Sequence, residues 1–417
     1  MMGQEIETVI IGGGQAGLST SYHLKQRGRE HIVLEAAAQP AHAWRDGRWD
    51  SFNLLTPNWS FRLPGADYQG SDPHGFMGRL EIIATFEEYV RRFQLPVQFG
   101  ERVSSVTPLR SGQGYLVETP ETTWTTRNVV VATGLYQRAK KPLMSADLAP
   151  QLTQLHSIQY RHPGALPPGA VLVVGSGQSG CQIAEELYLS GHRVYLCTSS
   201  AGRAPRRYRG KDIFEWLQLS GFLDRTVDVL PSPKAKFAAN PHLSGRDGGR
   251  TLNLHQFARD GVTLLGHILD GRGHTIKLAP DIKDNLAKAD QFEAELVKLV
   301  DTFIAQAGLE APLEELPLLR DGFAAEELPE LDLSQAGVTS IIWAFGFAFD
   351  FNLVKLPVFD GDGYPIQQRG VTAFPGLYFV GLPWLYKNKS GLLSGVGEDA
   401  EYIASAIATD EHRHSNP

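Results

Sequence analysis

Two stretches of the chain share one pattern of apolar and polar positions. In each, a short apolar run leads into a glycine-rich turn and then into a stretch with helical spacing. The first is TVIIGGGQAGLSTSYHL, beginning at Thr8, and the second is GAVLVVGSGQSGCQIAEEL, beginning at Gly169. A short apolar run bounded by glycines is typical of a buried parallel strand. The pattern therefore predicts the strand–turn–helix start of a dinucleotide-binding unit twice in one chain.

The first turn carries Gly12, Gly14 and Gly17 in the GxGxxG spacing. Glycines at these positions allow a tight bend, a close approach of a pyrophosphate to the backbone, and close packing of helix on strand. The next apolar run, HIVLE, ends on Glu35, where a carboxylate would bind the two hydroxyls of an adenosine ribose. This register predicts a bound dinucleotide; the alternative is a glycine-rich turn without a ligand.

The second turn has the same spacing, with Gly175, Gly177 and Gly180, but the strand after it does not end on an acid. The polar residues that follow this strand are Thr198, Ser199, Ser200, Arg203, Arg206 and Arg207. Hydroxyls and guanidinium groups would bind a 2′-phosphate, which a carboxylate would repel. The predicted ligand is therefore NADPH; the alternative is that the arginines belong to a solvated loop.

Two dinucleotide sites in one chain indicate a hydride donor beside an acceptor, that is, FAD reduced by NADPH. RNVVVATGLY ends a strand at Ala132-Thr133-Gly134, where we expect the chain to cross between the two units beside the cofactor. SIIWAFGFAFD, residues 340–350, is the expected crossing back. The predicted fold class is α/β with two Rossmann-like dinucleotide-binding domains: an FAD domain formed by residues 1–165 and 334–417, split in sequence around an NADPH domain of residues 166–333.

The C-terminal pattern predicts one more strand and one more helix at the FAD site. FPGLYFVGLPW is an apolar run that ends on Gly381, and a helix is expected to begin near Leu392. The positive end of that helix dipole would stabilise an anionic reduced flavin. The alternative is a glycine-rich loop followed by a helix that serves only for packing.

Residues 231–333 predict an elaborated segment within the NADPH domain. GVTLLGHILDGRGHTIKL indicates two strands with a turn at Asp270-Gly271. An amphipathic helix should follow and end before Gly308. Its apolar positions are Leu286, Ala289, Phe292, Leu296, Leu299, Val300 and Phe303. This stripe is expected to be core or a lid over the cleft; the remaining alternative is a subunit interface, which would make a homodimer.

Composition narrows the class of protein. The chain has 417 residues and a formal net charge of −7, which argues against a nucleic-acid partner. Its two cysteines, Cys181 and Cys197, form no CxxC pair, so neither a disulfide framework nor a metal site is expected. No apolar run reaches about 18 residues. Acidic Glu5 and Glu7 stand where a secretory signal would carry basic residues, so we expect a cytoplasmic protein without a membrane partner.

The two turns, the Ala-Thr-Gly crossing and the C-terminal helix together resemble the class B flavoprotein monooxygenases, in particular their bacterial flavin-containing-monooxygenase-like branch. The family's identifying motif, FxGxxxHxxxY, is matched in part by PQLTQLHSIQY, in which His156 and Tyr160 agree but Pro150 and Leu152 replace Phe and Gly. At the second crossing Phe345 stands where the family usually has Thr.

The resemblance implies an activity and further site residues. NADPH reduces FAD, O2 adds to give a C4a-(hydro)peroxyflavin, and one oxygen atom passes to a small organic substrate by N-, S- or Baeyer–Villiger-type oxygenation. Asn58 in the Thr56-Pro57-Asn58 loop would contact the flavin, and Trp44 and Arg45 would pack over FAD. His156 would position the two domains.

Two other functions fit the same pair of sites. One is an FAD-dependent NADPH oxidoreductase or dehydrogenase that passes electrons to another acceptor without oxygen insertion. The other is a non-catalytic flavoprotein that senses NADPH.

Overall fold

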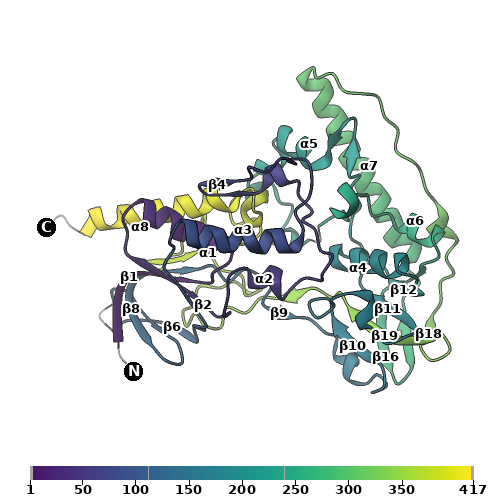
Figure 1. Ribbon diagram of the computed structural model, residues 1–417, viewed down its shortest axis with the longest axis horizontal. Coiled ribbons are helices and arrows are strands. Elements are labelled where there is room, and N and C mark those ends of the chain that lie inside the picture. Colours follow the sequence, from purple (N-terminus) through teal and green to yellow (C-terminus); the bar gives the residue numbers. More distant parts are fainter. Residues whose placement is uncertain (1–2, 111, 239, 415–417) are drawn as a thin grey trace.

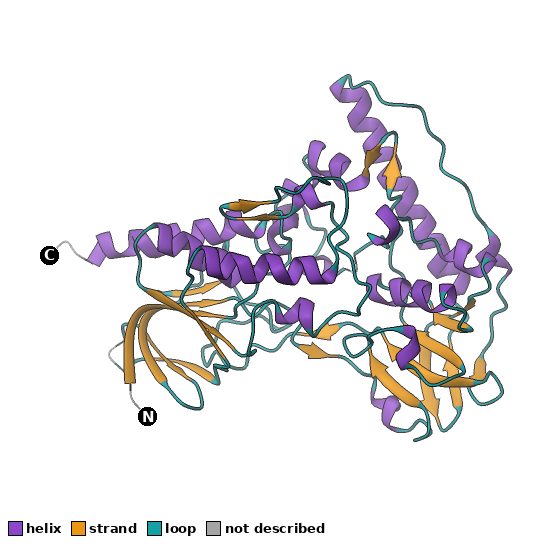
Figure 2. Ribbon diagram, viewed as in Figure 1, coloured by secondary structure: helices purple, strands orange, loops and turns teal. Residues whose placement is uncertain are grey.

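A computed structural model describes residues 3–110, 112–238 and 240–414 of the protein. Two α/β domains lie side by side, each built around its own sheet of mainly parallel strands (Figures 1 and 2). The first domain contains both the early and the late parts of the chain, and both ends lie at its outer side. This arrangement confirms the predicted fold class; the terminal residues 1–2 and 415–417 of the predicted FAD domain lie outside the described residues.

The sheet of the first domain has the strand order β5-β2-β1-β8-β7-β6, with β21 also paired to β8. Its strands are β1 (Gly3–Ile11), β2 (His31–Glu35), β5 (Val97–Phe99), β6 (Ser105–Pro108), β7 (Tyr115–Glu118), β8 (Thr123–Val131) and β21 (Leu377–Phe379). β1 is parallel to both β2 and β8, and Ile11 pairs with Leu34 and with Val131. The carboxyl ends of these three strands therefore meet at one edge, where a ligand binds in such folds.

Side chains of the first sheet alternate between two faces, as expected for strands. Ile10 packs with Val33 and Val130 beneath the helices α1 (Gln15–Gln26) and α8 (Val396–His414). Val9 and Ile11 belong to a core on the opposite face, which the β6–β7 hairpin helps to close. The smaller elements of this domain are α2 (His42–Arg45), η1 (Asn58–Ser60), β3 (Arg62–Leu63), β4 (Ala66–Asp67), α3 (Arg79–Arg92) and η9 (Asn388–Gly391).

The second sheet is parallel throughout and has the order β10-β19-β11-β12-β15. Its strands are β10 (Thr153–His156), β11 (Ala170–Val174), β12 (Val194–Cys197), β15 (Thr263–Leu265) and β19 (Val338–Trp343). β10 and β19 were expected in the FAD domain, but both pair within this sheet, so the pairing corrects the boundaries at 166 and 333. The second domain reaches from about residue 153 to residue 343.

Helices cover one face of the second sheet and a small antiparallel sheet covers the other. Val171 and Val173 face α4 (Gln178–Leu189) and α6 (Leu254–Arg259), whereas Leu172 and Val174 face the antiparallel sheet. That sheet consists of β16 (Ile268–Arg272), β17 (Thr275–Leu278) and β18 (Glu330–Asp332). The predicted turn at Asp270-Gly271 is wrong, because both residues lie within β16 and the turn falls at Gly273 and His274, where Gly273 has φ +59°.

The predicted amphipathic helix is confirmed as α7 (Ile282–Ala307), which ends at Gly308 in the left-handed conformation. Leu286, Ala289, Leu296 and Val300 of its predicted stripe are buried, so this part of the stripe is core. Phe292 remains 38% exposed.

The remaining short elements connect these layers. They are β9 (Arg138–Ala139), η2 (Leu143–Ala146), η3 (Pro163–Ala165), β13 (Arg207–Tyr208), β14 (Lys211–Asp212), α5 (Ile213–Leu219), η4 (Phe222–Asp224), η5 (Val227–Val229), η6 (Pro233–Phe237), η7 (Arg246–Gly248), η8 (Asp321–Ala324) and β20 (Phe347–Ala348). In the part of the chain that the structure describes, no helix is long and apolar enough to cross a membrane, and no three His, Cys, Asp or Glu side chains are grouped to hold a metal ion.

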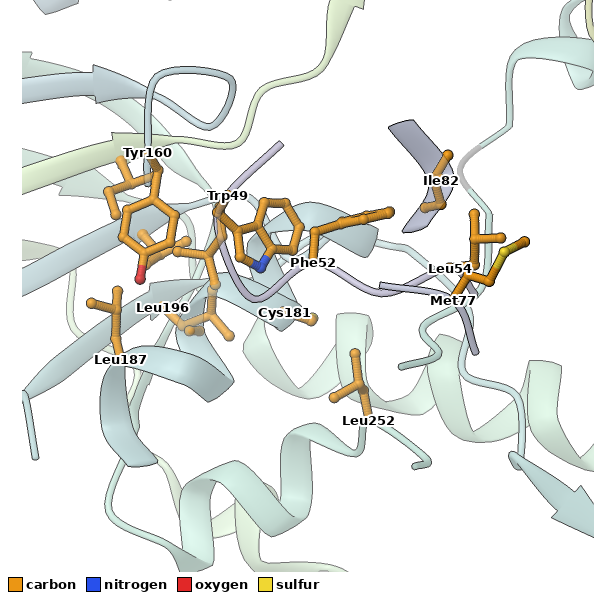
Figure 3. Packing of buried hydrophobic residues seen from close by; sticks show 14 of the residues in the cluster. Trp49, Phe52, Leu54, Met77, Ile82, Tyr160, Cys181, Leu187, Leu196 and Leu252 are labelled. Atoms are coloured by element: carbon orange, nitrogen blue, oxygen red, sulfur yellow. The ribbon is translucent and has the colours of Figure 1, made fainter. Parts of the chain in front are cut away.

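The two domains are joined by a ribbon and by a shared core. The outgoing crossing forms β9 and the returning crossing forms β20, and these two strands pair antiparallel. Trp49, Phe52 and Leu54 of the first domain belong to the same buried cluster as Cys181 and Leu196 of the second. Figure 3 shows Trp49 and Phe52 beside each other in this cluster. The two domains therefore share one buried apolar cluster in addition to the ribbon.

Candidate dinucleotide sites

The first glycine turn has the geometry of a phosphate-binding turn. Gly12, directly after β1, has φ +108°, and a methyl group there would lie 2.7 Å from the carbonyl oxygen of Ala132. A methyl group on Gly17 would overlap the carbonyl oxygen of Gly12, so this glycine lets α1 approach the strand. Packing of the protein on itself therefore explains these two glycines.

Gly14 differs because no contact or backbone strain among the described residues requires a glycine there. Its φ is −83°, which any residue adopts, and a Cβ atom placed there meets no atom within 4 Å. Gly14 is also the N-cap of α1, and no side chain caps the free N–H groups of the first turn. An open space in front of uncapped N–H groups fits a pyrophosphate.

Glu35 lies at the end of β2, directly beside this turn. One carboxylate oxygen accepts the N–H of Gly13 at 2.6 Å and the other accepts the N–H of Ala37 at 2.7 Å. Each oxygen keeps a further lone pair, so the group is held in one orientation and can still accept from a ribose. Glu35 therefore lies beside the first glycine turn, as the sequence predicted.

The C-terminal segment closes the same edge. Gly381 has φ +77°, and a side chain there would collide with Ala16 of α1, so β21 and the helix can meet only at a glycine. The side-chain amide of Gln15 donates to the carbonyl oxygen of Gly391 at 2.8 Å. The carbonyl oxygen of Leu392 accepts the N–H of Val396, the first residue of α8. The amino ends of α1 and α8 thus lie close together beside the first turn.

The second turn repeats the geometry of the first at its three glycines. Gly175 has φ +103° and its Cβ would lie 2.8 Å from the carbonyl oxygen of Ala344, and a methyl group on Gly180 would overlap the carbonyl oxygen of Gly175. Gly177, the N-cap of α4, has φ −71° and open space in front of it. The protein therefore has two phosphate-binding turns of the same kind, one in each domain. We call them the glycine cradles; they comprise residues 12–17 and 175–180.

Behind the second turn, β12 ends in hydroxyl groups as predicted. Thr198 is buried and donates to the carbonyl oxygen of Leu265 at 2.8 Å. The hydroxyl of Ser176 accepts the N–H of Ser199 at 2.8 Å and lies 3.2 Å from the Ser199 hydroxyl. Ser199 and Ser200 line a cavity of about 380 Å³ that also borders Gly175.

The three arginines after this strand do not form the predicted fork. Arg203 is 4% exposed and pairs with Glu293 and Asp290 of α7, both at 2.7 Å. Arg206 is 2% exposed and donates to Asp212 at 2.5 Å and to the carbonyl oxygen of Leu55, across the domain boundary, at 2.7 Å. Arg207 donates to the carbonyl oxygens of Gly248 and Gly249. These partners correct the expectation of an arginine fork on a 2′-phosphate.

Asn58 bonds to the backbone of its own loop. It is 4% exposed, its amide N–H donates to the carbonyl oxygen of Asp72 at 2.9 Å, and its amide oxygen accepts the N–H of Met77 at 2.7 Å. The Asn58 side chain therefore holds its own loop together, and its contact with the flavin stays a prediction.

Trp44 and Arg45 lie on α2, and Trp44 packs against the buried cluster that the two domains share. Trp44 packs against Phe52 with ring centroids 5.8 Å apart, and Arg45 pairs with Glu87 of α3 at 2.5 Å. Their contact with FAD stays a prediction.

Thr133 and Gly134 lie where the chain leaves β8, and Gln137 connects them to the returning crossing. The Gln137 amide donates to the Thr133 hydroxyl at 2.7 Å and to the carbonyl oxygen of Gly134 at 2.8 Å. Its oxygen accepts the N–H of Asp350. The pattern of the sequence did not single out Gln137, because its partner lies more than 200 residues away.

His156 contacts the returning crossing, in keeping with the positioning role that the family resemblance implied. Its Nδ1 accepts the N–H of Ile158, so Nε2 carries the proton and donates to the carbonyl oxygen of Gly346 at 3.1 Å. The ring also packs edge-on against Phe347. Burial lowers the pKa of His156, which keeps the ring neutral in this contact.

Comparison with known proteins agrees with the two-site architecture. Residues 9–218 match the sequence profile described as pyridine nucleotide-disulphide oxidoreductase. A Bacillus subtilis (strain 168) protein named Uncharacterized oxidoreductase CzcO is 33% identical over 402 residues, which cover 96% of this chain and 99% of the relative. The Arabidopsis thaliana indole-3-pyruvate monooxygenase YUCCA6 is 28% identical, covering 81% of this chain and 85% of the relative.

Among solved structures, the chain is similar in fold to a flavin-containing monooxygenase from Stenotrophomonas maltophilia. The TM-score is 0.65 at 21% sequence identity, and the match covers 97% of this chain and 99% of that one. The likeness extends over both domains, which places the two cradles on one common fold.

Proposed function

The chain belongs to the pyridine nucleotide-disulphide oxidoreductase family, and on this premise we propose that it is an NADPH-dependent FAD monooxygenase acting on a small organic substrate. The observation that carries the proposal is the pair of glycine cradles. The middle glycine of each, Gly14 or Gly177, faces open space that a pyrophosphate can occupy. One cradle would hold FAD permanently and the other would exchange NADPH. The relatives named as monooxygenases support oxygen transfer as the outcome.

The residues of the first domain fit FAD. The N–H groups at the start of α1 would bind its pyrophosphate across Gly14, and Glu35 would accept from its ribose hydroxyls. The start of α8 would direct positive potential toward the isoalloxazine ring. When bound, the flavin supplies the chemistry: it accepts two electrons from NADPH and uses them with O2, so that one oxygen atom enters the substrate and the other leaves as water.

The protein's own contribution is binding, orientation and exclusion of water. The start of α4 at Gly177 would hold the pyrophosphate of NADPH, and the shared core around Trp49 and Phe52 would exclude water from part of the domain boundary. Exclusion of water favours transfer of oxygen to a substrate over its loss.

The two cysteines argue against a dithiol-based reductase. Cys181 lies in α4 and Cys197 in β12, and both are buried and free. Burial raises the pKa of the Cys197 thiol to about 12 and raises that of Cys181 as well. A redox-active thiol needs a low pKa and access to its partner, so these two thiols do not provide one.

We place the enzyme in the cytoplasm, where thiols such as these stay reduced. O2 and a small molecule are its expected partners, without nucleic acid or membrane. A homodimer remains part of the proposal, through the exposed side of α7 around Phe292, and a sedimentation measurement tests it.

The decisive experiment mixes the NADPH-reduced protein rapidly with O2 in the presence of NADP⁺. A monooxygenase delays the return of oxidised-flavin absorbance and releases little H2O2 while it waits for substrate. Return of the absorbance without delay, with one H2O2 per NADPH, would favour an oxidoreductase without oxygen insertion. A protein that NADPH fails to reduce would be a sensor, which would overturn the proposal.

A further inference from the structure

A cavity beside the second turn is lined in part by residues that the sequence pattern did not single out. The cavity of about 380 Å³ lies at the carboxyl end of β12. Its lining from the turn and strand is Gly175, Thr198, Ser199 and Ser200, and α7 supplies Asn285 and Lys288. Phe345, which is 44% exposed, forms an apolar part of the wall. The cavity thus combines part of a glycine-rich turn, hydroxyl groups, the ammonium group of a lysine and an aromatic ring.

Lys288 is the cation of this cavity that is not already paired. It is exposed, and no hydrogen bond or ion pair engages its ammonium group among the described residues. Two further polar side chains of the cavity, His267 and Asp281, bond to each other: Nδ1 of His267 lies 2.6 Å from one Asp281 oxygen, and the backbone N–H of His267 donates to the other at 3.0 Å. Asp281 is therefore already provided with donors.

Asn285 fixes the orientation of this wall. It is buried in α7, one helical turn before Lys288, and its amide donates to the Thr198 hydroxyl at 3.2 Å. This bond joins α7 directly to the end of β12. Because residues three or four apart lie on the same face of a helix, the bond places Lys288 on the face of α7 that turns toward the strand end.

From these contacts we infer that the cavity receives the adenosine 2′-phosphate of NADPH, with Lys288 as the residue that distinguishes NADPH from NADH. This inference rests on the proposed function and deepens it. Ser199 and Ser200 would supply hydroxyl donors to the phosphate, and Phe345 would pack against the adenine. α7 therefore supplies the charge that the arginines after β12, held elsewhere, do not.

The test measures binding of nucleotide fragments, without turnover. Adenosine 2′,5′-bisphosphate and 5′-AMP are titrated by calorimetry into the FAD-loaded wild type and into Lys288→Ala, Lys288→Arg and Lys283→Ala. Lys283 is an exposed lysine of the same helix that does not line the cavity. We expect Lys288→Ala to weaken the bisphosphate about tenfold, as losing one charge-assisted contact does, and to leave 5′-AMP unchanged. Lys288→Arg should retain the preference and Lys283→Ala should match wild type.

Two outcomes would overturn the inference. One is an unchanged ratio of the two affinities in Lys288→Ala; the other is a wild type that binds 5′-AMP as tightly as the bisphosphate. Both leave the proposed function standing as long as NADPH still reduces the bound flavin. If NADPH does not reduce it, the proposed function fails, whichever fragment binds. The two failures are thus separate.

Discussion

His242 lies directly beneath the second glycine turn and gives the fold a dependence on pH. It is fully buried, its Nε2–H donates to the carbonyl oxygen of Ser176, and its Nδ1 has no partner among the described residues. Burial lowers its pKa from 6.5 to about 4. Between these values the unfolded chain binds a proton that the folded protein does not, so stability falls as the pH drops through this window.

The prediction compares the wild type with His242→Gln, which keeps an N–H donor but cannot titrate. On lowering the pH from about 7 to about 5, the free energy of unfolding of the wild type should fall by about 2 kcal/mol more than that of the variant. Urea unfolding at both pH values measures the difference. The other buried histidines are the same in both proteins and cancel. Parallel pH profiles would show that His242 is not the titrating group.

At the same scale, the arginines show what the sequence could not predict. The sequence shows that the three arginines follow β12. It does not show which groups they bind, because a long arginine side chain can reach many different partners. Arg203 finds Glu293 and Asp290 about 90 residues later, and Arg206 crosses to Leu55 in the other domain. Glu35 was predictable because its neighbour Gly13 is fixed by the same strand–turn–helix unit. Local geometry can be read from local sequence, whereas the partner of a long side chain cannot.

Among the elements, the two glycine turns offer a matched pair of variants. Gly14→Val and Gly177→Val each place a side chain where the protein has only open space and an ordinary φ, so both variants should fold. We expect Gly14→Val to lose FAD because the side chain occupies the space of the pyrophosphate. Gly177→Val should keep FAD but lose its reduction by NADPH.

Flavin absorbance per protein and the rate of anaerobic bleaching by NADPH measure the two properties. Each variant is the control of the other, and circular dichroism confirms that both are folded. A Gly14→Val protein with full FAD, or a folded Gly177→Val protein without FAD, would contradict the assignment of one turn to each cofactor.

Elements with a long regular pattern were also predicted well, whereas short ones were not. α7 follows its apolar stripe to Gly308, because a helix of this length repeats its signal many times. The turn between β16 and β17 was misplaced by three residues, since glycines at both 271 and 273 permit a bend and only the pairing of Arg272 with Thr275 selects one. The hydrogen bonds between β16 and β17 determine where the turn lies, and these bonds depend on the whole three-stranded sheet.

For the molecule as a whole, the relation between the two domains depends on contacts that neither domain's pattern contains. The ribbon of β9 and β20 is one such contact. Another is the segment after α5, which reaches back to the FAD domain. There the N–H of Val227 donates to the carbonyl oxygen of Tyr386 at 2.8 Å. The N–H of Asn388 donates to the carbonyl oxygen of Arg225 at 2.9 Å. This segment ends close to α8, whose start is expected at the flavin.

Charges reinforce this docking. Asp224 of the second domain pairs with Lys387 and Lys389 of the first, both at 2.9 Å, and the two lysines also pair with Glu398 of α8. Although partial burial opposes it, the hydrogen bonds from the two lysines lower the pKa of Asp224. The cluster alternates in sign, so removing one carboxylate leaves two lysines sharing the other.

We therefore expect Asp224→Asn to loosen the docking of this segment while leaving each cradle intact. The pairs are partly exposed, so the free energy of unfolding should fall by only about 0.5–1 kcal/mol at low salt, and the difference should vanish near 1 M salt, where exposed charges are screened. Reduction of the flavin by NADPH should slow at low salt, with FAD content unchanged.

The matched control is Asp228→Asn, four residues along the same segment, whose carboxylate accepts from the Thr226 hydroxyl at 3.1 Å and from no other group in the described part of the chain. Urea unfolding and anaerobic bleaching at both salt concentrations separate the two variants. Equal behaviour of Asp224→Asn and Asp228→Asn would mean that the backbone bonds at Val227 and Asn388 hold the segment without help from charge. If Asp224→Asn remains less stable or is reduced more slowly at high salt as well, the substitution has disturbed the packing rather than the charge. Only a salt-dependent deficit confined to Asp224→Asn agrees with electrostatic docking of the two domains.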